Sequence, residues 1–400
     1  MKRIYFDHAA TTALDKDVLG KMKPYFSDKF GNASSLHAFG QEAKAALDES
    51  RQKVANILNC DPLEIIFNSG GTESDNLAIK GPVLAAFRDK LISKPLHIIT
   101  TKIEHPAILK TVKQLEKLFD FEATYADVDV NGLVNLSQLE SEIKDNTILI
   151  SVMYANNEVG TIEPIVEISK IVEKHREKRQ DNGNNLPIYF HADAVQAAGY
   201  LDVDVKKLGV DMLSISGHKF YGPKGTGLLY IKKGTGIEAL STGGGHENGL
   251  RAGTENISGI VGLAAALKSA QENKEMESKK VSGLRDYLTQ NLMKKIDGVI
   301  LTGHPEIRLP NIASFLIDRI EGESMLIKLD LKGIAVSTGS ACSSGSLEPS
   351  HVLKALNYPP EKIHGSLRIS LGKENTKEEV DYFLEVFPEI VYKLREISAL

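Results

Sequence analysis

The segment MLSISGHK, residues 212–219, is the stretch from which the fold is best inferred. Residues 212–216 carry no charge and include three large apolar side chains, which is typical of a buried strand. Directly after them come His218 and Lys219, two side chains that are able to do chemistry. The segment therefore predicts a reactive site at the end of a buried strand.

Three other short apolar runs end in the same way. The run at residues 96–101 leads into Glu104 and His105. The run at 147–154 leads into Asn156, Asn157 and Glu158, and the run at 187–191 leads into Asp193 and Gln196. Helical patterns at residues 41–59, 74–90, 107–120 and 165–178 and strand patterns at residues 64–68 and 227–231 complete this part of the chain. The alternation predicts βαβ units and a mostly parallel sheet. Because ligands bind beyond the carboxyl ends of strands in such sheets, the four polar strand ends predict one shared site.

The composition is that of an ordinary globular protein. The chain has 400 residues, of which 42% are hydrophobic and 25% charged, and its net charge is −5. This balance gives no reason to expect nucleic acid or a membrane as a partner. We find no signal peptide and no apolar run near the ~20 residues that span a bilayer. Two cysteines far apart, Cys60 and Cys342, fit a reducing compartment, so we expect a cytoplasmic protein.

The pattern changes after about residue 260. A long helical stretch at 257–292, which we expect to be broken or bent, leads to an apolar run, a Gly/Ser-rich segment and a final helix at 377–394. We therefore predict a large domain at residues 13–260 and a smaller α+β domain made of residues 1–12 and 261–400. The polar run at 173–185 is interpreted as a helix end followed by a solvated loop.

Two motifs could bind a phosphorylated carbonyl cofactor. Gly70 and Gly71 precede a helical pattern, and a helix N-terminus after glycines suits a phosphate, although a simple capped turn has the same pattern. Lys219 could form a Schiff base or could be a surface lysine after a turn; the rigid turn YGPKG at 221–225 favours a fixed direction.

The local sequence allows two interpretations of Asp193 and two of His105. Asp193 could hold the protonated nitrogen of a pyridine ring or could cap the next helix. His105 could stack on a ring and move protons or could be a structural histidine.

Three further features lie in the second half of the chain. The glycine-rich loop at 243–254 is longer than a flexible turn needs. Arg368 lies within a strand-like alternating segment. It could form a surface ion pair or could bind a carboxylate through two hydrogen bonds. Cys342, among Gly and Ser at 337–346, is either a bystander thiol or an exposed nucleophile or carrier, whereas Cys60 ends a helical stretch and is interpreted as structural.

Together these motifs resemble the cysteine desulfurases of iron–sulfur cluster assembly. The matching motifs are GGTESDNLA at 70–78, TKIEHPA at 101–107, ANNEVGTI at 155–162, HADAVQ at 191–196, SGHKFYGPKGTG at 216–227, GGGHENGLRAGTEN at 243–256 and STGSACSSGS at 337–346. The resemblance covers about nine-tenths of the chain, from residue 5 to residue 368. It implies the α/β fold of fold-type I pyridoxal-phosphate transferases, with a mostly parallel seven-stranded sheet in the large domain.

The resemblance also implies a role for each site residue. Lys219 would bind pyridoxal 5′-phosphate covalently, with His105 stacked on the ring and assisting proton transfer. The remaining cofactor ligands would be Asp193 at the ring nitrogen, Gln196 at the ring hydroxyl, Asn157, and Gly71, Thr72, Ser216 and His218 around the phosphate. Thr254 would come from the other subunit of an obligate homodimer. Asn157, Arg368 and the nearby Asn32 would bind the substrate.

The implied activity is removal of sulfur from L-cysteine, giving L-alanine and a persulfide on Cys342. The active-site loop, about residues 337–348, has the length and composition of the group that passes sulfur to scaffold proteins. No stable metal site is expected, although Cys342 could transiently ligate an iron–sulfur cluster in a complex with a scaffold. The alternatives are a selenocysteine lyase or aminotransferase-type enzyme of the same fold and, outside catalysis, a dimeric scaffold protein.

Overall fold

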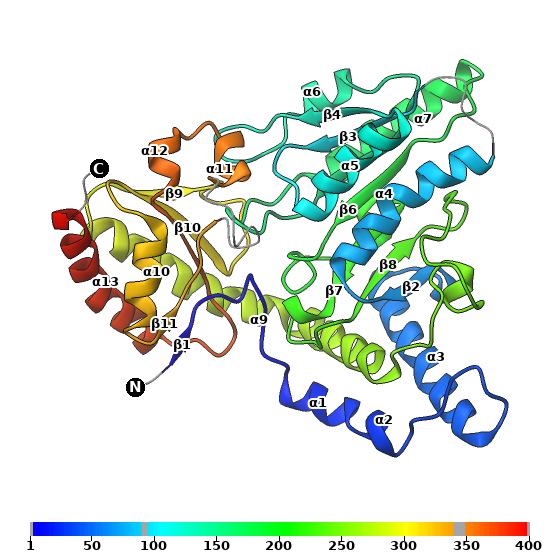
Figure 1. Cartoon of the computed structure of the whole chain (residues 1–400), viewed down its shortest axis with the longest axis horizontal. Helices are drawn as coiled ribbons and strands as arrows, with labels where there is room; N and C mark the ends of the chain where they lie inside the picture. The colour runs from blue at the N-terminus through cyan, green and yellow to red at the C-terminus, as the bar shows by residue number, and fades with distance from the viewer. Residues whose placement is uncertain (1–2, 90–94, 340–348, 398–400) are drawn as a thin grey trace.

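The computed structural model describes residues 3–89, 95–339 and 349–397, in which a large sheet lies between layers of helices (Figure 1). The strands are β1 (Ile4–Tyr5), β2 (Ile65–Asn68), β3 (His97–Thr101), β4 (Glu122–Ala126), β5 (Thr147–Met153), β6 (Tyr189–Asp193), β7 (Met212–Ser216), β8 (Gly227–Ile231), β9 (Val299–Thr302), β10 (Ile312–Ile317), β11 (Ile334–Ala335) and β12 (Ser366–Ser370). The α-helices are α1 (Lys16–Met22), α2 (Pro24–Ser27), α3 (Ala38–Leu58), α4 (Gly71–Arg88), α5 (Pro106–Phe119), α6 (Leu136–Ser141), α7 (Ile165–Asp181), α8 (Val205–Leu208), α9 (Ile257–Lys295), α10 (Gly322–Asp330), α11 (His351–Ala355), α12 (Pro360–Ile363) and α13 (Lys377–Ile397). Three 3₁₀ turns are η1 (Pro62–Glu64), η2 (Gly217–Lys219) and η3 (Glu247–Gly249).

The central sheet has seven strands in the order β2-β8-β7-β6-β5-β3-β4. Its neighbours pair in parallel except along β8, which runs antiparallel to both β2 and β7. The predicted mostly parallel α/β sheet is confirmed. The carboxyl ends of β3, β5, β6 and β7 consequently lie at one edge, as the polar strand ends require.

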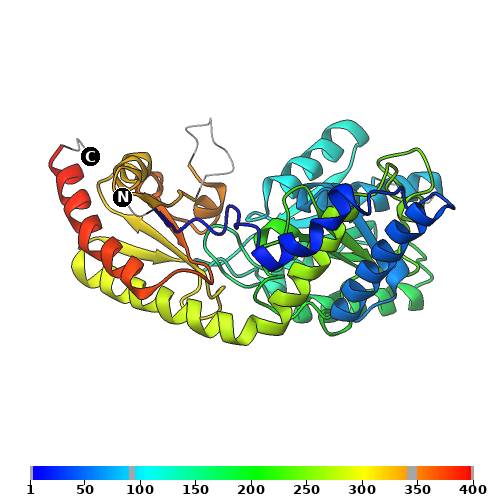
Figure 2. The same ribbon diagram turned by 90° about the horizontal axis from the view of Figure 1, so that it is seen from below.

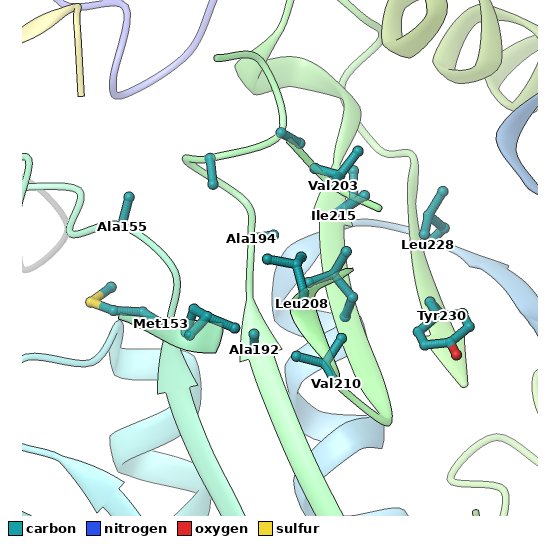
Figure 3. Packing of buried hydrophobic residues seen from close by; sticks show 14 of the residues in the cluster. Met153, Ala155, Ala192, Ala194, Val203, Leu208, Val210, Ile215, Leu228 and Tyr230 are labelled. Carbon is teal, nitrogen blue, oxygen red and sulfur yellow. The ribbon is translucent and has the colours of Figure 1, made fainter. Parts of the chain in front are cut away.

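The two faces of this sheet bury separate apolar clusters. In β8, Leu228 and Tyr230 belong to the cluster that also contains α3 and α9, whereas Leu229 packs with α4 and α5 on the other face. Successive strand residues point to opposite faces, so each strand contributes to both clusters. Figure 3 shows part of the first cluster around Leu228 and Tyr230. Burial on both faces explains why these strands read as continuous apolar runs.

A second group of elements lies beside the large sheet (Figure 1). It contains the antiparallel sheet β12-β10-β9 and the short parallel pair β1-β11, in which Ile4 lies opposite Ile334. A third cluster, which includes Phe6, Phe383 and Phe387, packs α13 on these strands. The N-terminal strand therefore lies with the C-terminal part of the chain.

Helix α9 joins the two cores. It is one continuous helix of 39 residues that curves along the molecule (Figure 2), so of the two expected forms, broken or bent, the bent form is present. Its first half buries Leu263 and Leu267 in the core of the large sheet, and its second half buries Leu288 and Leu292 in the C-terminal core. Because both halves are held by packing, no break is needed between them. The domain boundaries at 12/13 and 260/261 stay a prediction. Within the described residues, no helix combines the length and the apolar character needed to cross a bilayer.

The polar run at residues 173–185 is the end of a helix followed by an exposed loop, as predicted, and it contains one buried arginine. Helix α7 continues to Asp181, and Arg179 is only 6% exposed. Its guanidinium donates to the carbonyl oxygens of Leu186 at 2.9 Å and Lys144 at 2.6 Å. This one arginine is buried within the polar helix end because backbone carbonyls accept its hydrogen bonds.

The glycine-rich loop is anchored through Glu247. This side chain is buried and accepts from Arg51 at 2.6 and 3.0 Å and from the backbone N–H of Phe67 in β2 at 2.8 Å. Glu247 and Asn248 have positive φ angles of 47° and 58°, which cost energy in non-glycine residues. The buried ion pair holds this conformation, so the loop is not a free surface turn.

We predict that Glu247→Ala destabilises the protein by about 3–5 kcal/mol, because it leaves Arg51 buried without its counter-charge. The control is Asp48→Ala, which removes the exposed ion pair with Lys44 and should cost less than about 0.5 kcal/mol. Urea unfolding of both variants checks the difference. Equal losses in the two variants would contradict the anchoring role of Glu247.

Candidate active site

A cavity of about 270 Å³ lies at the carboxyl edge of the central sheet. Ten of the residues singled out from the sequence line it: Gly71, Thr72, His105, Asn157, Asp193, Gln196, Ser216, His218, Lys219 and Arg368. They come from the ends of β3, β5, β6 and β7, from the N-terminus of α4 and from β12. The predicted shared site therefore exists as a geometric arrangement.

Lys219 is presented to the cavity by a tightly held turn. It ends η2, directly after β7, and its Nζ donates to the carbonyl oxygens of Ala9 at 2.6 Å and Ala10 at 2.8 Å. The next residues are fixed by Thr12, whose Oγ1 accepts from the N–H of Tyr221 at 2.7 Å, where φ is +65°. The alternative of a surface lysine is therefore wrong: the amine is directed inward.

Asp193 ends β6 and is only 6% exposed. Its Oδ1 accepts from the N–H of Val195 at 2.9 Å, but a turn and not a helix follows, so Asp193 is not the helix cap that the sequence left open. Burial raises the pKa of Asp193 to about 6, while the Val195 N–H and the charge of Lys219 act in the opposite direction. The site thus contains a desolvated carboxyl group close to an amine.

Two more buried carboxyl groups lie near Asp193, and the sequence analysis assigned neither a role. Asp75 of α4 lines the cavity, and burial together with the charge of Asp193 raises its pKa well above the usual range. Glu104 is fully buried, and burial raises its pKa to about 8. Its Oε1 accepts from Thr101 Oγ1 at 2.7 Å and from Met153 N–H at 2.9 Å. Glu104 is therefore expected to hold a proton at neutral pH. The position of Asp75 and Glu104 inside sequence motifs was the only signal for them.

The histidines of the site are neutral. Burial, assisted by the charge of Lys219, lowers the pKa of His105 and of His218 to about 4. His105 Nδ1 accepts from the N–H of Ala107 at 3.1 Å, so the proton of its neutral ring lies on Nε2. His218 Nδ1 lies 3.1 Å from Thr11 Oγ1. The two histidines thus add no positive charge to that of Lys219.

The N-terminus of α4 forms a close-fitting backbone cradle. A Cβ on Gly71 would lie 2.6 Å from Val195 Cγ2, and Gly70 has a φ of +147°. Glu73 caps the turn, since its Oε2 accepts from the N–H of Ser69 at 2.8 Å. The first amides of this 18-residue helix therefore face the cavity beside Ser216, as an anion site requires.

Arg368 is almost fully buried, at 1% exposure. Its guanidinium donates to the carbonyl oxygen of Asn157 at 2.8 Å and to Asp7 Oδ1 at 3.0 Å. Its Nε is buried without a hydrogen-bond partner among the described residues. The alternative of a surface ion pair is wrong, because the guanidinium is buried at the wall of the cavity, where its charge suits an anionic ligand.

Two predicted site residues, Asn32 and Thr254, do not line this cavity, and the structure does not describe a third. Asn32 is exposed, and its Oδ1 accepts from the N–H of Ser34 at 2.9 Å. Thr254 is exposed and does not line the cavity. Cys342 lies outside the described residues. Cys60 is partly buried, and burial raises the pKa of its thiol to about 12, which agrees with a structural role.

Comparisons with known proteins agree with this geometry. The family model described as aminotransferase class V matches residues 4–383. The chain is 51% identical to "Cysteine desulfurase IscS" of Dictyoglomus turgidum, with 100% of this chain and 97% of the relative covered, and 51% identical to the protein of the same name from Methanosarcina thermophila, with 100% and 94% covered. Among solved structures, a "NIFS-like protein" superposes with a TM-score of 0.89 at 40% identity, covering 98% of this chain and 100% of the other.

We predict that Glu104→Gln stabilises the protein in alkaline but not in acidic solution. The folded pKa of about 8 lies above the unfolded value of 4.5, so ionisation of Glu104 costs stability increasingly as pH rises between these values. Glutamine retains the Oε1 acceptor and removes the titration. The stability gain should be near zero at pH 4 and about 3–5 kcal/mol at pH 9. Urea unfolding at both pH values checks this, and a gain that does not change with pH would contradict the buried charge.

Proposed function

The chain belongs to the class V aminotransferase family and is a cysteine desulfurase, and from this premise we propose how its residues divide the reaction. The cavity binds pyridoxal 5′-phosphate and L-cysteine, and Cys342 receives the sulfur. The observation that carries this proposal is the convergence of Lys219, Asp193 and the N-terminus of α4 on one cavity.

The residues present fit the cofactor at three points. The amine of Lys219 would bind its aldehyde carbon, the buried carboxyl of Asp193 would face its ring nitrogen, and the amides at Gly71 and Thr72, with Ser216 and His218, would hold its phosphate. The lack of space for a Cβ at Gly71, which packs against Val195, fixes the start of α4 at the wall of the cavity. When bound, the cofactor supplies an electron-poor ring that withdraws electrons from the bonds at the substrate's α-carbon.

The other residues position the substrate and move its protons. The guanidinium of Arg368 and the side chain of Asn157, two residues that line the cavity, would hold the carboxylate of L-cysteine. The amine of Lys219, once released, would take the proton from the α-carbon, with the Nε2–H of His105 assisting. Gln196, whose Nε2 donates to the carbonyl oxygen of Ala9 at 3.0 Å, lines the cavity and would bind the ring hydroxyl.

The sulfur leaves by thiol chemistry. The Cys342 thiolate attacks Sγ of L-cysteine, an S–S bond forms and the Cβ–Sγ bond breaks. Its electron pair stays on Cβ, which takes up a proton to become a methyl group, and the α-carbon regains a proton from Lys219, which gives L-alanine. The enzyme thiol becomes a persulfide, and an acceptor thiol of a scaffold protein in iron–sulfur cluster assembly would take the outer sulfur.

The proposed assembly is a homodimer. Thr254 is exposed on one chain and absent from its own cavity, as expected for a residue that completes the cofactor site of a second subunit. Asn32 is exposed as well, and its place near the substrate depends on the same assembly or on a movement of its loop. A cytoplasmic location stays a prediction from the cysteine content.

We predict that Cys342→Ser abolishes persulfide formation and slows alanine formation by more than about a hundredfold, because a free thiol lacks the effective concentration of a tethered one. Mass spectrometry after incubation with L-cysteine should show one added sulfur on the Cys342 peptide of the wild type. Cys60→Ser is the matched control and should behave as the wild type. Alanine formation at the wild-type rate in Cys342→Ser would rule out the carrier role.

A further inference from the structure

One carboxyl oxygen contacts both ends of the segment that carries Cys342. Ser350 Oγ donates to Glu158 Oε2 at 2.5 Å, and a Cβ built on Gly339 would lie 2.8 Å from the same oxygen. Gly339 is the last described residue before residues 340–348, and Ser350 is the second described residue after them. Glu158 therefore lies where the two ends of this segment come together.

Glu158 is itself held rigidly from the side of the central sheet. The N–H groups of Glu158 and Val159 donate to Asn156 Oδ1 at 2.8 and 2.9 Å. Asn156 in turn donates through Nδ2 to the carbonyl oxygen of Ile103 at 3.0 Å. The residue directly before Glu158 in the chain is Asn157, which lines the cavity. The carboxyl of Glu158 is thus fixed relative to the substrate site.

The residues on either side of the segment have further contacts with the cavity walls. His351 Nε2 lies 2.9 Å from the carbonyl oxygen of Glu104, the residue before His105. On the other side, Ser337 exchanges backbone hydrogen bonds with Arg368, at 2.7 and 3.2 Å. Each contact is made to a cavity residue or to its chain neighbour, so the geometry of the two ends is tied to the geometry of the site.

The burial of Glu158 is unexplained by the cofactor and substrate roles. Glu158 is 5% exposed, and it is absent from the lining of the cavity. Burial raises its pKa to about 7, against the opposing charge of Arg368. Burying a carboxyl group lowers stability relative to burying an apolar side chain. The position of Glu158 at the two segment ends therefore suggests a function that offsets this cost.

We propose that Glu158 is a positioning residue that holds Gly339 and Ser350 together and thereby sets the approach of Cys342 to the substrate sulfur. This inference rests on the proposed function of Cys342. Glu158 need not touch the substrate: it acts through the path that the chain takes into and out of residues 340–348.

The test separates substrate binding from sulfur transfer in the holoenzyme. The variants are Glu158→Ala, Glu158→Gln and Ser350→Ala. Cysteine affinity is measured from the change in cofactor absorbance, and the rate of persulfide formation on Cys342 from quenched samples by mass spectrometry. Glu163→Ala is the matched control, because Glu163 is equally buried in the same connection but accepts from the N–H of Val134, at 2.9 Å.

We expect Glu158→Ala to form the persulfide about tenfold more slowly or worse, since small misplacements of reacting groups are costly, while cysteine affinity changes by less than about threefold. Ser350→Ala should show the same split to a smaller degree. Glu158→Gln retains an acceptor for Ser350 and should recover most of the rate. Glu163→Ala should leave both quantities near the wild-type values.

The outcomes distinguish this inference from the function on which it rests. Wild-type rates in Glu158→Ala and Ser350→Ala, with persulfide present on Cys342, would overturn the role of Glu158 alone. Absence of persulfide from wild-type Cys342 would overturn the proposed function and this inference with it. If Glu158→Ala does not fold, Ser350→Ala and Glu158→Gln decide the question, and a rate loss in Ser350→Ala supports the proposal.

Discussion

The whole site depends on the burial of one carboxyl group, Asp193, at the end of β6 and next to the amine of Lys219. Removing a carboxylate from water is costly, and the cost is tolerable only where donors and a positive charge compensate it. The N–H of Val195 and the charge of Lys219 do this here. A cofactor with a protonated ring nitrogen would add a second positive charge next to this carboxylate and would further offset the cost of its burial.

The neighbouring titratable groups are consistent with this constraint. His105 and His218 are kept neutral by burial and by Lys219, and burial favours the protonated forms of Glu104 and Asp75. Few competing charges therefore remain within the cavity. The parallel sheet makes the arrangement possible, because four strand ends place these side chains at one edge while their apolar residues are buried on both faces.

The architecture of the large sheet and most of the cavity could be predicted from the sequence, because both follow from local patterns. A charge-free strand such as β7 is recognised by its own residues, and the polar side chains that follow it belong to the same short segment. The continuity of α9 could not be predicted, since it depends on two cores that hold its two halves. The burial of Arg179 likewise depends on carbonyl groups of other segments.

Contacts between residues far apart in the sequence were the part of the site that could not be predicted. Glu158 and Ser350 are 192 positions apart, and no local pattern indicates that they meet. Asn32 and Thr254 were assigned from a resemblance, and a single chain does not bring them to the cavity. The residues that the sequence identified are thus those that follow strands directly, whereas those that position other groups emerged from the three-dimensional arrangement.

The covalent attachment of the cofactor tests the account most directly. Borohydride would reduce the bond between the bound cofactor and the protein, and peptide mapping by mass spectrometry would locate the added pyridoxyl group. The account predicts this group on Lys219 alone. Its presence on Lys224, five residues further along the same motif, or on no lysine at all would contradict the assignment of the active site.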